Sequence, residues 1–281
     1  STHKGVSHKC GHDGHATLLL GAAKYLSENP DFDGTVNLIF QPAEEGGGGA
    51  NEMIKDGLLE KFPMSQVFGM HNWPDIPKGK FSICSGPIMA AVNTIQIKIT
   101  GRGGHAAMPH QTIDPIIIGS HIVNALQTIS SRTIDPIETI VLSITQFHSG
   151  TTHNIIPDEA KLVGSVRTLD PQTREVVLRR LEEISTSVVK ALRAEADVQI
   201  MTGVPAVNNN AEVCKDVWRS AVETVGAENV VDPGQATVGD DMSYFLNEAP
   251  GCYFLLGVAN PTKGIGAPLH SPEFDIDENA L

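Results

Sequence analysis

The sequence predicts an α/β domain that is interrupted by an inserted α+β domain. Near both ends of the 281-residue chain, continuous apolar runs alternate with helix-forming stretches, as in a sheet buried on both faces. Between them, strand and helix patterns follow the order β-α-β-β-α-β, which is the ferredoxin-like unit. We therefore expect residues 1–91 and 204–281 to form the α/β domain and residues 92–203 to form the insert.

The first α/β segment is expected to contain a helix, a strand, a second helix and a second strand. Residues 14–28 are rich in helix formers, and residues 35–42 (TVNLIFQP) form an apolar run typical of a buried strand. A Gly-rich turn then leads into a helix, and residues 65–74 (SQVFGMHNWP) predict another buried strand that ends near a histidine. Sites in parallel sheets lie at the carboxyl ends of strands. The polar residues expected at that edge are Glu44, Glu45 and His71.

The middle segment has a different pattern. Ile95, Ile97 and Ile99 alternate with polar residues, which indicates a strand in a sheet with one wet face. Asp170 followed by Pro171 is a typical start of a long helix. The elements expected here are strands over residues 93–101, 138–150, 160–169 and 197–203, and helices over residues 112–130 and from Pro171.

The last segment returns to the α/β pattern. It predicts a helix over residues 211–226, a short helix in DDMSYFLNE and a buried strand over residues 251–258. The chain begins inside a motif without Met and stops after Asp277, which is typical of a helix N-cap. We therefore expect a chain truncated at both ends.

Composition narrows the class of function. The formal net charge of −13 argues against nucleic acid or an anionic membrane as the main partner. No apolar run is long enough to predict a membrane-spanning helix. The four cysteines are far apart and form no CxxC pair, so we expect reduced thiols and a cytoplasmic protein.

The stretch SHKCGHDGH (residues 7–15) is the first candidate site. Cys10 and His12 carry a thiol and an imidazole, the usual ligands of a borderline transition metal. The alternative is a buried cysteine beside a cluster that caps a helix. Asp13 and His15 are expected either to orient a metal ligand or to act as caps.

Further candidate ligands occur in the outer segments. In the adjacent pair Glu44-Glu45, one carboxylate could bind metal while the other moves a proton, although such a pair is usually solvated surface. Single histidines are more often satisfied polar residues than ligands. The combined set is nevertheless too large for one tetrahedral zinc and favours a two-metal site. That set is Cys10, His12, Glu45, His71 and His270.

The inserted segment contains its own polar candidates. Glycines around His105 indicate a tight loop from which the imidazole can reach outward. Arg167 lies inside a strand pattern, where it either binds an anion such as a carboxylate or lies on the wet face of the sheet. Asn154 is the third polar residue of this group.

These motifs resemble the aminoacylase/amidohydrolase branch of the two-metal exopeptidases, which includes hippurate hydrolases, indole-acetyl-amino-acid hydrolases and N-acetyl-diaminopimelate deacetylases. The resemblance covers essentially the whole chain in the same order. It implies a zinc-exopeptidase-like catalytic domain with an inserted ferredoxin-like lid that also dimerises. The motifs are HKCGHDGHATLLLGAA, QPAEEGGGGA, MHNWPDIPKG, GRGGHAAMPHQTIDPI, HNIIPDEAKLVGSVRT and LHSPEFDID.

The resemblance also implies a set of ligands. Cys10 would bridge two divalent ions per chain, which could be zinc, manganese, nickel or cobalt. Glu45 and His270 would complete one site, and His12 and His71 would complete the other.

Catalytic roles follow from the same resemblance. Glu44 would be the general base, and His105 of a partner subunit would stabilise the oxyanion. Asn154 and Arg167 would hold the substrate. Relatives carry an upstream Asp that supports the metal site, and this segment would precede Ser1.

A second departure concerns the acidic pair. Relatives have a pair led by Glu where this chain has Asp240 and Asp241, which keep the charge and are expected to support the metal site. The expected activity is hydrolysis of N-acyl amino acids or related small amides by a homodimer. The alternatives are a dipeptidase, a catalytically silent metal-binding relative and a thiol redox protein. The last lacks a second cysteine near Cys10.

Overall fold

A computed structural model describes residues 4–232 and 234–281. Its contacts divide the chain into two compact units. The first consists of Ser1–Ile88, Val207–Gln235 and Asp241–Leu281, and the second of Met89–Ala206 and Ala236–Asp240. The sequence placed the first boundary after residue 91 and the second after residue 203. It gave no sign that residues 236–240 belong with the insert, because a single bridge from Met89 to Ala236 has no pattern of its own.

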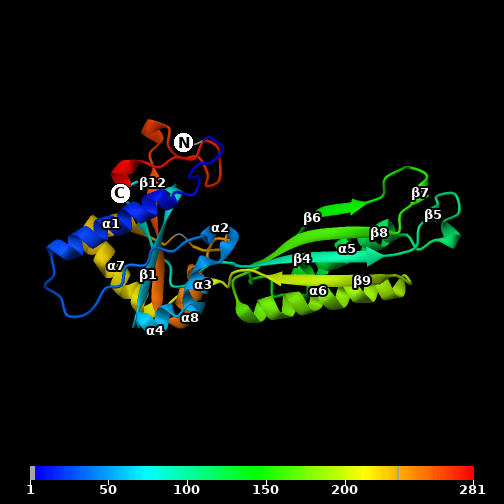
Figure 1. The fold of residues 1–281 in the computed structure, drawn as a ribbon, viewed down its shortest axis with the longest axis horizontal. Helices are drawn as coiled ribbons and strands as arrows, with labels where there is room; N and C mark the ends of the chain where they lie inside the picture. The colour runs from blue at the N-terminus through cyan, green and yellow to red at the C-terminus, as the bar shows by residue number, and fades with distance from the viewer. Residues whose placement is uncertain (1–3, 233) are drawn as a thin grey trace. The chain divides into compact units, whose positions relative to one another are not determined.

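The first unit is built on a mixed sheet. β1 (Val67–Pro77) and β12 (Gly251–Ala259) are parallel neighbours, paired from Val67–Gly251 to Trp73–Gly257 (Figure 1). β2 (Phe81–Ser82) is antiparallel to β12 and parallel to β11 (Val230–Val231), which gives the order β1-β12-β2-β11. The α/β class is confirmed, and the sheet is mixed where a parallel one was expected.

Helices and short strands complete the first unit. The apolar run over residues 251–258 is a buried strand as predicted, because β12 has neighbours on both sides. The remaining elements are α1 (His12–Glu28), α2 (Glu44–Gly47), α3 (Gly49–Lys55), α4 (Leu58–Lys61), β3 (Gly86–Met89), β10 (Val207–Asn209), α7 (Ala211–Val225), η3 (Ala227–Asn229), α8 (Met242–Glu248), η4 (Pro261–Lys263) and η5 (Glu278–Ala280).

The predicted strand over residues 35–42 is wrong. None of these residues belongs to a strand, and the alternate side chains Val36, Leu38 and Phe40 are 50%, 39% and 50% exposed. A strand needs a hydrogen-bonding neighbour as well as an apolar pattern. β1 is the edge strand of its sheet, and among the described residues only β12 pairs with it.

The second unit is an antiparallel sheet covered by two helices. β4 (Ala91–Thr100), β6 (Ile140–Ser149), β8 (Glu159–Thr168) and β9 (Glu195–Thr202) lie in the order β6-β8-β4-β9. α5 (Pro115–Thr128) and α6 (Pro171–Ala191) supply the connections, so the predicted β-α-β-β-α-β order is present (Figure 1). Short elements are β5 (Gly104–His105), η1 (Pro109–Gln111), η2 (Ile129–Thr133) and β7 (Ile155–Ile156).

One apolar core holds the second unit together. Ile95, Ile97 and Ile99 of β4 are fully buried against α5 and α6. At the start of α6, the Asp170 carboxylate accepts a hydrogen bond from the Thr173 N–H at 2.6 Å, which confirms the predicted cap. In the part of the chain that the structure describes, no helix combines the length and apolarity needed to cross a bilayer.

Candidate metal centre

The turn that carries Cys10 and His12 has a backbone conformation that requires glycine. Gly11 precedes α1 with φ of 82°, in the left-handed region that residues with a Cβ avoid. This turn places the buried Cys10 just before the helix and His12 in its first turn. No side chain caps the helix at Gly11, so the helix-capping alternative for this cluster finds no support.

Asp13 follows His12 in the first turn of α1. Its side chain is exposed, and the hydrogen bond that it receives from Thr17 Oγ1 goes to its main-chain carbonyl at 2.8 Å. Its expected role in orienting a ligand stays a prediction.

His71 lies inside β1, because the strand continues to Pro77; the expectation that it ends the strand is wrong. The ring is buried, and its Nδ1–H donates to the Asn72 carbonyl at 2.6 Å. That bond directs Nε2 toward the Cys10 Sγ, 3.4 Å away. A histidine that donates one ring N–H to a carbonyl presents its other nitrogen as a metal ligand.

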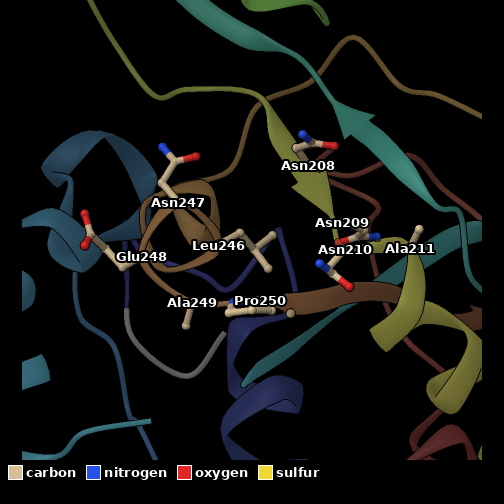
Figure 2. Close-up of a pocket in the computed structure, with 10 residues that line it drawn as sticks. Asn208, Asn209, Asn210, Ala211, Leu246, Asn247, Glu248, Ala249 and Pro250 are labelled. Carbon is tan, nitrogen blue, oxygen red and sulfur yellow. The ribbon is translucent and has the colours of Figure 1, made fainter. Parts of the chain in front are cut away.

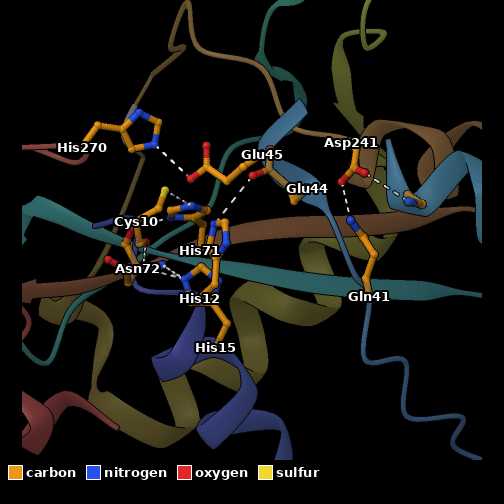
Figure 3. Close-up of polar contacts among 11 residues, drawn as sticks. Cys10, His12, His15, Gln41, Glu44, Glu45, His71, Asn72, Asp241 and His270 are labelled. Atoms are coloured by element: carbon orange, nitrogen blue, oxygen red, sulfur yellow. Dashed lines mark hydrogen bonds and ion pairs between the residues drawn. The ribbon is translucent and has the colours of Figure 1, made fainter. Parts of the chain in front are cut away.

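The Glu44-Glu45 pair begins the short helix α2. It follows Ala43, whose φ of 55° is left-handed and sterically costly for a residue with a side chain. Glu44 Oε2 lies 3.6 Å from His12 Nε2, and Glu45 Oε1 lies 3.2 Å from His270 Nε2. The two adjacent carboxylates therefore face different histidines (Figure 3).

His270 comes from the other end of the sequence. Its main-chain N–H donates to the main-chain carbonyl of Lys9 at 2.7 Å, which fixes His270 close to Cys10 in the structure. Its φ of 63° is the second left-handed non-glycine conformation in this region, after Ala43. Such strained residues concentrate at functional sites, where the surrounding structure holds them.

The ligand atoms gather into overlapping groups. Those of Cys10, His12 and His71 lie within 4.8 Å of one another, and so do those of Cys10, Glu45 and His270. Cys10 belongs to both groups, and the donor atoms are the sulfur, nitrogen and oxygen types that zinc and its neighbours accept. These residues therefore fit two adjacent divalent ions.

Two residues that the sequence did not single out as site residues lie behind this cluster. Asn72 contacts both Cys10 and His15, and Gln41 donates to the Asp241 carboxylate at 2.5 Å. Burial, followed by the charges of His71 and His12, lowers the pKa of His15 to about 2, so this ring stays neutral. An asparagine or a glutamine within a strand pattern carries no sequence signal of such a role.

Asp241 holds the segment that contains the two glutamates. Its fully buried carboxylate accepts from Gln41 on one side of the pair and from the Ala50 N–H, at 3.1 Å, on the other. Asp240 is also buried and falls within the second unit.

The polar candidates of the second unit lie at two ends of its sheet. His105 and Asn154 are neighbours: Ala106 N–H donates to the Asn154 carbonyl at 3.0 Å, where β5 pairs with β7. Arg167 lies near the other end of β8, paired with Val92, and its Nε donates to Ser165 Oγ at 3.2 Å. Burial lowers the pKa of its guanidinium, which lies on the sheet face opposite the core.

The remaining cysteines belong to the core of the first unit. Burial raises the pKa of Cys84 to about 11, with Asp232 adding to the effect, and also raises the pKa of Cys214 and of Cys252. They are therefore protonated thiols, which are poor ligands and poor nucleophiles. Cys10 is the cysteine that lies with candidate ligands.

A separate cavity of about 450 Å³ is lined by residues around the start of α7 and the end of α8 (Figure 2). Its buried Asn209 amide is already hydrogen-bonded to the Cys84 and Tyr253 carbonyls, and Asn210 caps α7. These polar groups serve the fold, and none of the candidate metal ligands lines this cavity.

An α/β unit with a cysteine shared between two ligand groups and a carboxylate at their margin defines the class of two-metal hydrolases. The sequence profile of Peptidase family M20/M25/M40 matches residues 1–281, and the chain belongs to this family.

Similar proteins and solved structures support this family assignment. The chain is 43% identical to thermostable carboxypeptidase 2 of Saccharolobus solfataricus, over 99% of the chain and 70% of that protein. It is 40% identical to N-acetyl-L-cysteine deacetylase of Bacillus subtilis, over 100% of the chain and 66% of that protein. The structure of the Bacillus subtilis YXEP protein, described as a dinuclear metal binding peptidase, superposes with a TM-score of 0.82 at 31% identity, covering 97% of the chain and 68% of that protein.

Proposed function

We propose that this protein is a metal-dependent amidohydrolase that cleaves the amide bond of N-acyl amino acids or related small acyl-amides. The observation that carries the proposal is the position of Cys10 in two ligand groups, with Glu44 beside His12 at their margin. Family membership and the deacetylase relative support the same reaction class.

In this proposal, Cys10 would contribute a ligand to both ion sites. His12 and His71 complete one site, and Glu45 and His270 complete the other. Bound zinc, manganese, nickel or cobalt would act as a Lewis acid that lowers the pKa of a water molecule toward neutrality.

Glu44 is proposed as the general base. Its carboxylate is about one-quarter exposed and holds no metal in this scheme, and it would take the water proton and pass it to the leaving amine. Asp241, with Asp240 beside it in sequence, is proposed to keep the glutamate segment in place.

The second unit is proposed to serve as lid and dimerisation domain. His105 and Asn154 lie where β8 begins, whereas Arg167 lies eight positions along from Glu159, or about 26 Å at roughly 3.3 Å per residue. One small substrate cannot touch both ends of this strand. We therefore propose that Arg167 binds the substrate carboxylate and that His105 and Asn154 act from a partner subunit.

The hydrogen bonding of the His105 ring supports a donor role. Its Nδ1 accepts a hydrogen bond from the Ala107 N–H at 3.1 Å, so the neutral ring carries its proton on Nε2 and can donate it to an oxyanion. None of the four cysteines, all of which lie in the described part of the chain, forms a disulfide, which supports a cytoplasmic location.

A peptidase is the second candidate. The carboxypeptidase relative favours peptide substrates, and nothing in the ligand set separates a peptide from an acyl amide. Rates of hydrolysis across matched acyl-amino acids and dipeptides, measured with each metal added, separate the two.

Replacing Glu44 tests the base. We expect Glu44→Gln to lower kcat by about 10²- to 10⁴-fold, because the amide cannot accept a proton, and to leave metal content unchanged. The control is Glu60→Gln, which alters an exposed carboxylate of α4. Full activity in metal-loaded Glu44→Gln would rule out this role, and an inactive parent with two ions bound would favour the catalytically silent relative.

Mixing two inactive variants tests the dimer. Glu44→Gln and His105→Ala each spoil a different half of the site. Heterodimers formed by mixing would contain one intact site, so activity should return to a measurable fraction of the parent's. No recovery after confirmed subunit exchange would place His105 in the same subunit or outside the site.

A further inference from the structure

Asn72 connects the ligand-bearing elements from behind. It follows His71 in β1 and is 1% exposed. Its side-chain nitrogen donates to the Cys10 carbonyl at 2.6 Å, and its main-chain carbonyl accepts from His71 Nδ1 at 2.6 Å. One residue thus fixes the backbone of one candidate ligand and the ring of another (Figure 3).

His15 fixes the orientation of the Asn72 amide. The main-chain N–H of Asn72 lies 3.0 Å from His15 Nε2, and its side-chain nitrogen lies 2.6 Å from the same atom. A ring nitrogen that receives two N–H groups must be the acceptor. Turning the amide over would place its oxygen against two acceptors, His15 Nε2 and the Cys10 carbonyl.

This arrangement leaves a buried oxygen without a partner. Asn72 Oδ1 has no hydrogen bond among the described residues. Buried side-chain oxygens are normally satisfied, and exceptions occur where a residue has a second task. Here the orientation that leaves Oδ1 unpaired is the one that directs the nitrogen at Cys10.

Gly11 shows how closely the amide supports the turn. A Cβ placed on Gly11 would collide with the side-chain nitrogen of Asn72. The Cys10–Gly11–His12 turn therefore rests directly on Asn72.

We propose that Asn72 is a positioning residue that holds Cys10, His12 and His71 in the geometry of the metal site before any ion binds. The inference rests on the proposed two-metal function. It states that Asn72 strengthens metal binding and sets the geometry of the ligands, in addition to stabilising the fold.

The test compares two buried asparagines of the first unit. Asn72→Asp keeps the shape and replaces the donor to the Cys10 carbonyl by an acceptor. Asn209→Asp is the matched control, because Asn209 is also buried and donates to a cysteine carbonyl, that of Cys84, outside the ligand groups. The readouts are Co²⁺ affinity by titration and the Co²⁺ absorption spectrum, each measured on protein shown to be folded by near-UV circular dichroism.

We expect Asn72→Asp to weaken Co²⁺ binding by about 10- to 100-fold and to shift the spectrum, as for other groups that orient metal ligands. Asn209→Asp should lower stability and leave both readouts unchanged. If Asn72→Asp does not fold, Asn72→Ser is the second variant. Its side chain is too short to bond the Cys10 carbonyl and adds no charge, so it should show the same loss of Co²⁺ affinity.

The outcomes separate the inference from the function on which it rests. The inference alone is overturned if the parent binds two ions and a folded Asn72 variant keeps the same Co²⁺ affinity and the same Co²⁺ absorption spectrum. Equal losses in the Asn72 and Asn209 variants reduce Asn72 to a structural role and also overturn it. A parent that binds no ions overturns both the inference and the proposed function.

Discussion

Cys10 is the residue on which both ligand groups depend. Because its sulfur belongs to each group, Cys10→Ala should lose both ions, whereas His270→Ala should lose about one. Elemental analysis after purification without chelators measures the ratio of metal to protein. His110→Ala, which changes an exposed histidine of the second unit, should keep two. Two ions in Cys10→Ala would contradict the bridging assignment.

The sequence alone was enough to predict the candidate metal ligands. It was not enough to predict the residues that hold those ligands in place. Cysteine, histidine and glutamate carry a chemical signal that a family resemblance can place in order. Asn72 carries none, because its role depends on where β1 meets the turn before α1. Asp13 shows the converse: its place between two histidines suggests a role from the sequence alone, and the structure adds only that its side chain is exposed.

At the level of elements, the carboxylate of Asp277 holds the segment after β12 in place through several hydrogen bonds. Asp277 is buried and accepts hydrogen bonds from Lys263, Asn260 and Lys78. Lys263 first, and then Asn260, hold its pKa well below the ordinary value of 3.8. The loop that carries His270 lies between η4 and this anchor.

This anchor predicts an acid-sensitive contribution to stability. A depressed pKa means that the unfolded chain binds more protons than the folded one below about pH 4, so the stabilisation is complete above that pH and is lost as the pH falls further. Asp277→Asn should therefore be less stable than the parent at pH 6, and the difference should begin to narrow as the pH is lowered below about 4. Urea unfolding measures the difference, with Asp275→Asn as an exposed control. A constant difference between the two proteins at every pH would contradict this linkage.

Two apolar runs show where sequence prediction of the elements succeeds and fails. Residues 35–42 and residues 251–258 have the same continuous pattern, yet only the second forms a strand. The apolar pattern indicates only that the side chains can be buried. Whether the segment forms a strand depends on whether a neighbouring strand is available to pair with it. For the same reason, the antiparallel unit was predicted well: its strands and helices find their partners within about a hundred consecutive residues.

At the scale of the whole molecule, the candidate ligands come from four separate stretches of the first unit, around residues 10–12, 44–45, 71 and 270. Ions bound there would act as cross-links. Binding stabilises the folded state by about 2.7 kcal/mol when free metal is 100 times its Kd.

Chelation should therefore lower the melting temperature of the first unit. Both tryptophans, Trp73 and Trp218, lie in that unit, so tryptophan fluorescence reports its unfolding alone. We expect the transition to fall with EDTA and to recover when zinc or manganese is returned. Cys10→Ala should show little response to either addition, and an equal response in that variant would place the stabilising ions elsewhere.

The exposed segment over residues 35–42 bears on how the protein behaves in a test tube. Val36, Leu38 and Phe40 are exposed apolar side chains in a segment outside the helices and strands, and exposed apolar surface of this kind favours association between molecules. The net charge of −13 keeps molecules apart at low ionic strength. In about 1 M salt, where the screening length falls to roughly 3 Å, that repulsion is lost and concentrated stocks should turn cloudy. A low-salt buffer is the safer condition for storage.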